Sequence, residues 1–127
     1  MEKIIEERAN NNQKLNFNIT EVIIPGVVEP AEMLIQNREL KRPGAGQVVI
    51  KVEASGISFA EQAMRRDRYH GQPKFPFVPG YDLVGTVEAT GDGVTPSPVG
   101  KRFAALTKTG AWATMVAVNV EDLLPVP

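Results

Sequence analysis

The chain has 127 residues, the size of one globular domain, and 43% of them are hydrophobic, which is enough for a core. The formal net charge of -1 gives no reason to expect nucleic acid or a membrane as a partner. The absence of cysteine and the presence of one histidine exclude disulfides, thiolate metal sites and histidine clusters. No signal peptide or membrane span is apparent, so we expect a cytoplasmic protein.

Residues 1–20 are predicted to form a polar N-terminal arm, because "NNNQK" and its neighbours are polar and of low complexity. Short apolar runs then recur between turn residues, and we expect them to be strands. They are residues 21–26, 32–40, 46–54, 83–89, 100–106 and 111–120. Many short strands separated by Gly and Pro turns predict a mostly β domain over residues 21–127, folded as a barrel or sandwich.

Residues 49–54 alternate between two kinds of side chain, which predicts one buried face and one solvated face. The residues on the predicted buried face are Ile50, Val52 and Ala54, and those on the solvated face are Val49, Lys51 and Glu53.

One segment departs from the strand pattern and predicts a short helix. Ser58 is followed three residues later by Glu61, which is a capping box. Phe59, Ala63 and Met64 supply the apolar side of this helix.

Neither glycine motif predicts a phosphate site. Gly44 and Gly46 are followed by a strand instead of a helix, and no third glycine completes a dinucleotide fingerprint. The stretch "GYDLVG" at 80–85 has the outer spacing of a phosphate loop, but Thr86 and Val87 stand where Lys and Ser or Thr are needed. We therefore expect no nucleotide site in this chain.

The other polar residues form no recognisable catalytic motif. Glu61, Asp67, Asp82 and Asp92 match no acid/base pattern, and surface or capping roles explain most of them. His70 lies in a polar turn and is predicted to be exposed.

Four stretches occur together in one order: "GISFAEQAMRRDRY", "PKFPFVPGYDLVGTVEATGDGV", "VGKRFAAL" and "GAWATMVAV". With them, residues 21–127 resemble the N-terminal catalytic domain of the medium-chain dehydrogenase/reductase superfamily, and most of all its zinc-free, zeta-crystallin-like quinone oxidoreductase branch. The resemblance implies a GroES-like, partly open β-barrel with one or two short helices. It also implies that NADPH donates hydride to a quinone or an enone.

The resemblance also implies that the catalytic zinc of other relatives is absent. In zinc-dependent relatives, the positions that match Ser58 and Tyr81 carry a cysteine and a histidine ligand. A hydroxyl and a phenol are poor zinc ligands beside thiolate and imidazole. Ala60 stands at the position where alcohol dehydrogenases carry a hydroxyl group that relays protons. Within the quinone oxidoreductase branch, Ser58 matches a position that is often asparagine and Glu61 one that is usually aspartate.

Five residues are candidates for the site. Tyr81 and Asp82 match positions that face the active-site cleft of the family. Tyr81 is therefore a catalytic candidate that would form part of the cleft wall against nicotinamide or substrate. The alternative is that Tyr81 is a half-buried strand aromatic and that Asp82 accepts backbone amides near a turn. Ser58 and Glu61 are cleft candidates, although a capping box already explains both. Tyr69 either hangs over the cleft or covers apolar surface.

The flanking glycines, Gly80 and Gly85, are predicted to let the backbone pack closely at a barrel corner.

Family members continue into a Rossmann domain that holds NADPH, whereas this chain stops at "DLLPVP". One hypothesis is the substrate domain of an NADPH-dependent quinone or enone oxidoreductase, inactive as this chain alone. The alternative is a free-standing GroES-like barrel that acts as a non-enzymatic binding or assembly module. In the second case, open sheet edges favour a homo-oligomer.

Overall fold

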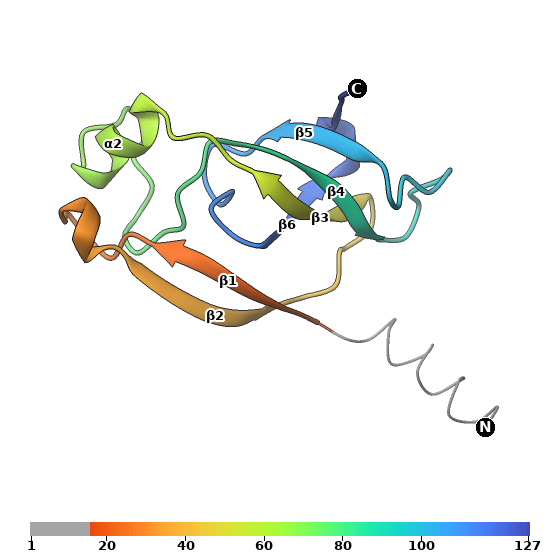
Figure 1. The fold of residues 1–127 in the computed structure, drawn as a ribbon, viewed down its shortest axis with the longest axis horizontal. Coiled ribbons are helices and arrows are strands. Elements are labelled where there is room, and N and C mark those ends of the chain that lie inside the picture. Colours follow the sequence, from red (N-terminus) through yellow and green to blue (C-terminus); the bar gives the residue numbers. More distant parts are fainter. Residues whose placement is uncertain (1–15) are drawn as a thin grey trace.

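A computed structural model describes residues 16–127 and shows a mostly β domain with short helices (Figure 1). The strands are β1 (Phe17–Ile23), β2 (Leu34–Leu40), β3 (Gln47–Ala54), β4 (Asp82–Thr90), β5 (Arg102–Leu106), β6 (Met115–Asn119) and β7 (Leu124–Pro125). The helices are α2 (Phe59–Arg65) and the single turns η1 (Pro30–Glu32) and η2 (Val120–Asp122). The predicted fold class is confirmed. No helix in residues 16–127 has the length and apolar character needed to cross a membrane.

The start of the domain differs from the expected boundary. Strand β1 begins at Phe17, so residues 17–20, which the sequence assigned to the polar arm, belong to the first strand. They pair with β2 in register from Phe17 opposite Leu40 to Ile23 opposite Leu34. The rest of the predicted polar arm, residues 1–15, lies outside the described residues.

The strands form two antiparallel sheets that do not close into a complete barrel. One sheet contains β1 and β2, and the other has the order β6-β3-β4-β5-β7. The segment before β6 joins them, because the Val22 amide donates to the Trp112 carbonyl at 3.0 Å and the Thr114 amide donates to the Thr20 carbonyl at 2.9 Å. Figure 1 shows β1 and β2 running beneath the larger sheet.

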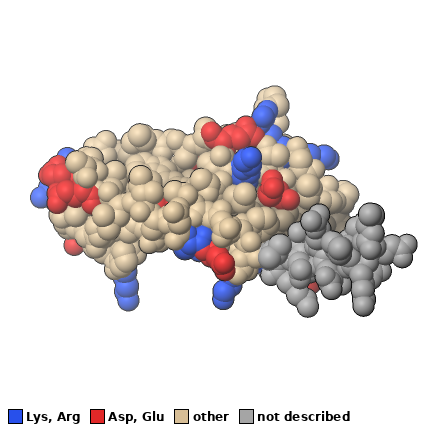
Figure 2. Space-filling model, turned by 60° about the horizontal axis from the view of Figure 1, so that its bottom comes forward, with Lys and Arg blue, Asp and Glu red and all other residues tan. Residues whose placement is uncertain are grey.

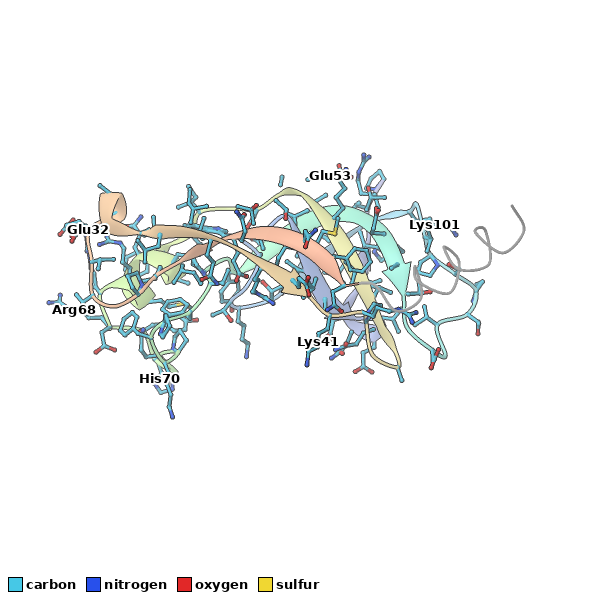
Figure 3. All side chains as sticks on the ribbon, turned by 90° about the horizontal axis from the view of Figure 1, so that it is seen from below. Glu32, Lys41, Glu53, Arg68, His70 and Lys101 are labelled. Atoms are coloured by element: carbon cyan, nitrogen blue, oxygen red, sulfur yellow. The ribbon has the colours of Figure 1, made fainter. Side chains whose placement is uncertain are left out.

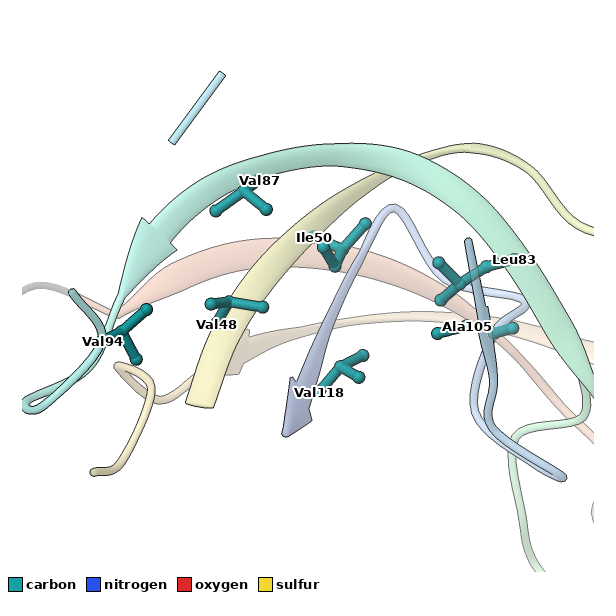
Figure 4. Close-up of a cluster of buried hydrophobic side chains, with 8 residues drawn as sticks. Val48, Ile50, Leu83, Val87, Val94, Ala105 and Val118 are labelled. Carbon is teal, nitrogen blue, oxygen red and sulfur yellow. The ribbon is translucent and has the colours of Figure 1, made fainter. Parts of the chain in front are cut away.

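The core lies on one side of the larger sheet (Figure 4). Its buried members are Val48, Ile50, Leu83, Val87, Val94, Ala105, Ala111 and Val118. Val49, expected on the solvated face of β3, is also fully buried. Strand β3 is central, between β4 and β6, and both faces of its first half are covered. Alternation is therefore lost there, as in strands buried on both sides.

Helix α2 begins after Ser58, as the capping box predicts. Its buried face differs from the predicted one, because Phe59 is 83% exposed while Glu61, Met64 and Arg65 are buried. These three residues are spaced at i, i+3 and i+4 and share one side of the helix. The helix therefore turns two charged side chains toward the domain and an aromatic ring toward solvent.

Gly80 and Gly85 let the backbone pack closely, as predicted. A Cβ on Gly85 would lie 2.2 Å from the Lys51 carbonyl oxygen on the neighbouring strand. Gly80 has a φ of +119°, and a Cβ there would lie 2.5 Å from the Trp112 nitrogen. Both contacts are with backbone atoms, which cannot move aside as a flexible side chain can.

We expect Gly85→Ala to lower the free energy of unfolding by about 3 kcal/mol, because the added methyl group overlaps the Lys51 backbone of the adjacent strand. Urea denaturation measures this change. Gly26→Ala is the matched control, since a Cβ at Gly26 meets no atom within 4 Å, and its effect should stay within about 1 kcal/mol. Equal effects of the two substitutions would contradict the close approach at Gly85.

Candidate functional site

The candidate site is built on a turn that leads into β4. Residues 78–80 lie against residues 110–112, and three backbone hydrogen bonds of 2.8 to 3.2 Å join the two segments. Tyr81 follows this turn directly, and its carbonyl oxygen accepts bonds from the amides of Thr107 at 2.7 Å and Lys108 at 3.0 Å. The backbone that carries the Tyr81 side chain is thus held by neighbouring segments at several points.

Glu61 connects this turn to the start of helix α2. Glu61 is 3% exposed, and its carboxylate accepts bonds from the Ser58 amide at 3.1 Å and the Tyr81 amide at 3.3 Å. The Ser58 hydroxyl also donates to it. These donors compensate a buried charge that would otherwise be costly. The capping role predicted for Ser58 and Glu61 is confirmed, and Glu61 additionally fixes the backbone of Tyr81.

Tyr69 and Tyr81 lie close together although twelve positions separate them in the sequence. Partial burial, and after it the neighbouring Tyr81 phenol, raise the pKa of the Tyr69 phenol above its ordinary value. The Tyr69 backbone is held by its amide, which donates to Gln72 Oε1 at 3.2 Å. The structure therefore brings together two phenols that the sequence placed in the site.

Asp82 accepts a backbone amide, which was the predicted alternative to a role in the cleft. Its Oδ1 accepts the Gly56 amide at 3.0 Å, and its carbonyl oxygen accepts the Ser55 hydroxyl at 2.7 Å. The Trp112 indole donates to the Gly56 carbonyl oxygen at 3.1 Å. Asp82 and Trp112 thus hold the strand end from which the chain enters α2.

The five predicted residues do not line one common pocket. A pocket of about 430 Å³ includes Glu61 and Trp112, and a second one of about 440 Å³ includes Asp82. Ser58, Tyr69 and Tyr81 line neither of these pockets. The structure instead joins Ser58, Glu61 and Tyr81 through hydrogen bonds, sets Tyr69 beside Tyr81, and engages Asp82 with Gly56.

His70, predicted to be exposed, is exposed and lies in the loop after α2 near Arg68 (Figure 3). Within residues 16–127, no three His, Asp or Glu side chains gather as a metal site would require.

The two glycine segments at 44–46 and 80–85 do not lie at helix starts. Gly44 and Gly46 lie in the turn before β3 and open no helix. This turn packs against backbone, since a Cβ on Gly91 would lie 1.8 Å from the Gly44 carbonyl oxygen. The space that a side chain would take at Gly80 or Gly85 is likewise occupied by neighbouring backbone. None of these glycine segments presents free amides at a helix start for a phosphate group.

Comparison with known proteins identifies the family. The family described as "Alcohol dehydrogenase GroES-like domain" matches residues 44–127. The mouse protein named "Synaptic vesicle membrane protein VAT-1 homolog-like" is 31% identical over 106 residues, which cover 84% of this chain and 25% of that protein. The chain belongs to the medium-chain dehydrogenase/reductase superfamily. The resemblance seen in the sequence is thereby confirmed.

Solved structures of this superfamily share the fold. The crystal structure of the human VAT-1 homolog-like protein matches with a TM-score of 0.81 and 30% identity, over 87% of this chain and 36% of that one. A quinone oxidoreductase from Thermus thermophilus, described also in its complex with NADPH, matches with a TM-score of 0.65 and 34% identity. That match covers 85% of this chain and 32% of the Thermus chain. The chain thus spans about a quarter to a third of the length of these relatives.

Two residues of this region were not identified from the sequence. Trp112 lies within "GAWATMVAV", one of the stretches that carry the superfamily resemblance, yet its indole bond to Gly56 depends on a contact between distant segments. Arg65 is 8% exposed and lies one helical turn after Glu61. Its spacing from Glu61 could have indicated a shared helix face, but an arginine is ordinarily read as solvated.

We expect Glu61→Gln to lower the free energy of unfolding by about 1–3 kcal/mol, because an amide NH2 replaces one acceptor oxygen and leaves a buried donor without a partner. Chemical denaturation measures the loss. Glu88→Gln removes an exposed carboxylate of β4 and should change stability by less than about 0.5 kcal/mol. A Glu61→Gln variant as stable as Glu88→Gln would show that the carboxylate does not connect α2 to the Tyr81 turn.

Proposed function

We propose that the chain is the substrate domain of an NADPH-dependent quinone or enone oxidoreductase, in which hydride passes from nicotinamide to a conjugated carbonyl. The observation that carries this proposal is the pair of phenols, Tyr69 and Tyr81, held on fixed backbone in a chain of this superfamily. The 34% identity with the Thermus quinone oxidoreductase supports the same reaction class.

Tyr81 has the chemistry to orient such a substrate. Its ring offers a flat apolar face to a planar quinone or to nicotinamide, and its hydroxyl is a hydrogen-bond partner for the substrate oxygen. The neighbouring Tyr69 phenol is neutral at physiological pH even at an ordinary pKa of about 10, so with its pKa raised it also remains a hydrogen-bond donor. Ile57 and Phe59, 79% and 83% exposed, add apolar surface on both sides of Ser58.

We further propose that the reaction needs no catalytic zinc and that a separate Rossmann domain holds the dinucleotide. Neither position that matches a zinc ligand of relatives offers a good zinc ligand here. The Ser58 hydroxyl donates a hydrogen bond to Glu61, and position 81 carries a phenol. The glycine turns at 44–46 and 80–85 pack against backbone, which supports a cofactor held by other residues.

An assembly module remains a second candidate because of one edge strand. Strand β2 pairs with β1 on one side and has no partner on its other edge within the described residues. Leu34 and Ile35 on this strand are 54% and 75% exposed. An open edge with apolar side chains is a template for strand pairing between copies, so this reading favours a homo-oligomer.

Tyr81 variants test the active-site role in the full polypeptide in which the chain occurs. We expect Tyr81→Phe to lower kcat/KM with NADPH and 1,4-benzoquinone by roughly 2- to 10-fold, because one hydrogen bond is lost and the packing is kept. Tyr81→Ala should lower it clearly further at nearly unchanged melting temperature. If Tyr81→Ala instead costs about 3 kcal/mol of stability and leaves normal specific activity in the folded fraction, Tyr81 is a core residue.

The two candidate functions differ in what the 127-residue chain does by itself. We expect no oxidation of NADPH with 1,4-benzoquinone, because hydride transfer requires the nicotinamide to be held near contact distance and the glycine turns offer no phosphate cradle. Turnover that copurifies with the chain would contradict the proposed division between substrate and cofactor domains. Analytical ultracentrifugation of the same sample tests the alternative, which requires a stable oligomer that a charged substitution at Ile35 dissociates.

A further inference from the structure

The pocket of about 430 Å³ beside α2 contains a buried cation. Arg65 lines this pocket and is 8% exposed. Its Nη1 donates to the Val28 carbonyl oxygen at 2.5 Å, which is its one hydrogen bond within residues 16–127. No described side-chain nitrogen is both fully buried and without a partner, so the remaining guanidinium nitrogens keep some accessible surface, on a residue that lines the pocket.

No carboxylate of the described residues forms an ion pair with Arg65. The ion pairs within residues 16–127 are Arg38 with Glu21 and Arg102 with Glu53, so no acidic oxygen of the described residues lies within 4.0 Å of the Arg65 guanidinium. Glu61 lines the same pocket, but its two oxygens accept from Ser58 and Tyr81. A largely buried guanidinium with one hydrogen bond and no ion pair has donors left for a charge-assisted bond, which an anion in the pocket would form.

The rest of the pocket wall is largely apolar. Ile24, Pro30, Met33, Ile57 and Trp112 line it. Glu29 and Arg66 complete the charged part of the lining, which with Arg65 and Glu61 holds two positive and two negative groups. Because these charges balance, the lining has no net positive charge to hold a dianion. One negative charge on an apolar body suits Arg65 and the apolar walls better.

The surface charge of the domain gives no long-range attraction for an anion. On the face shown in Figure 2, acidic and basic side chains are interspersed on a mostly neutral surface, and the net charge is -1. Selectivity would rest on the guanidinium inside the pocket, whose planar fork suits a carboxylate. The volume lies within the range of small-molecule sites.

We propose that this pocket binds a small organic monocarboxylate, with its carboxylate on Arg65 and its apolar body against Met33, Ile57 and Trp112. The site is separate from the proposed catalytic phenols, because neither Tyr69 nor Tyr81 lines it. Glu61 is the one predicted site residue that belongs to the pocket. The inference does not depend on the oxidoreductase activity.

Trp112 is the only tryptophan in the chain, so its fluorescence reports directly on this pocket. The 127-residue chain is titrated with octanoate, with octanol as a neutral ligand of the same chain length, and with inorganic phosphate. We expect saturable binding of octanoate that is at least about tenfold tighter than that of octanol, which corresponds to the loss of a charge-assisted bond. Octanol binding as tightly as octanoate, or phosphate binding more tightly, would overturn the proposal.

Two pairs of variants locate the charge. Arg65→Gln should weaken octanoate binding by about tenfold or more, while Arg68→Gln, which removes an exposed arginine outside the pocket, should leave it unchanged. Arg65→Gln also loses the bond to Val28, so a second pair keeps Arg65 intact. Ile57 is 79% exposed at the pocket, and Ile57→Glu places a competing carboxylate there whereas Ile57→Gln does not.

We expect Ile57→Glu to bind octanoate at least about tenfold more weakly than Ile57→Gln, because the new carboxylate competes for Arg65. Calorimetric titration and circular dichroism on both variants separate binding from folding. Equal octanoate affinity of the two folded Ile57 variants would show that Arg65 does not hold the carboxylate.

Discussion

The structure depends on the contact between residues 78–80 and residues 110–112. The two backbones approach this closely because position 80 has no Cβ, which would lie 2.5 Å from the Trp112 nitrogen. Trp112 then connects three parts of the domain. Its amide donates to Pro79, its carbonyl accepts from Val22 of β1, and its indole donates to Gly56 before α2. The backbone and indole bonds of Trp112 thus join the two sheets and the segment that precedes the helix.

A buried carboxylate extends this contact to the candidate site. Glu61 reaches from α2 to the Tyr81 amide and also caps the helix that carries it. Removal of a charge from water is unfavourable, so this arrangement persists only while Ser58 and Tyr81 supply its donors. The same helix turns Arg65 into the domain one turn later, where no carboxylate of the described residues meets it. Both carboxylate oxygens of Glu61 are therefore hydrogen-bonded, whereas the Arg65 guanidinium has one described bond, to the Val28 carbonyl oxygen.

Features set by local chemistry could be predicted from the sequence. The start of α2 after Ser58, the turn glycines and the strand-rich class follow from short-range spacing and backbone geometry. Burial at Val49 could not, because it depends on which strands lie beside β3. For the same reason Phe59 was assigned to the wrong face of α2, since hydrophobicity alone favours burying the ring. The nearness of Tyr69 to Tyr81 and the separate engagement of Asp82 with Gly56 arise from tertiary packing that no local pattern encodes.

Amide hydrogen exchange followed by NMR tests the central contact most directly. If residues 78–80 and 110–112 support the whole domain, the amides of Gly110 and Trp112 should exchange only when the protein unfolds globally. Their opening free energies should then equal those of core amides such as Ile50 and Val87 in β3 and β4. Exchange of the Gly110 and Trp112 amides through a local opening, while the β3 and β4 amides stay protected, would show that this contact is peripheral to the fold.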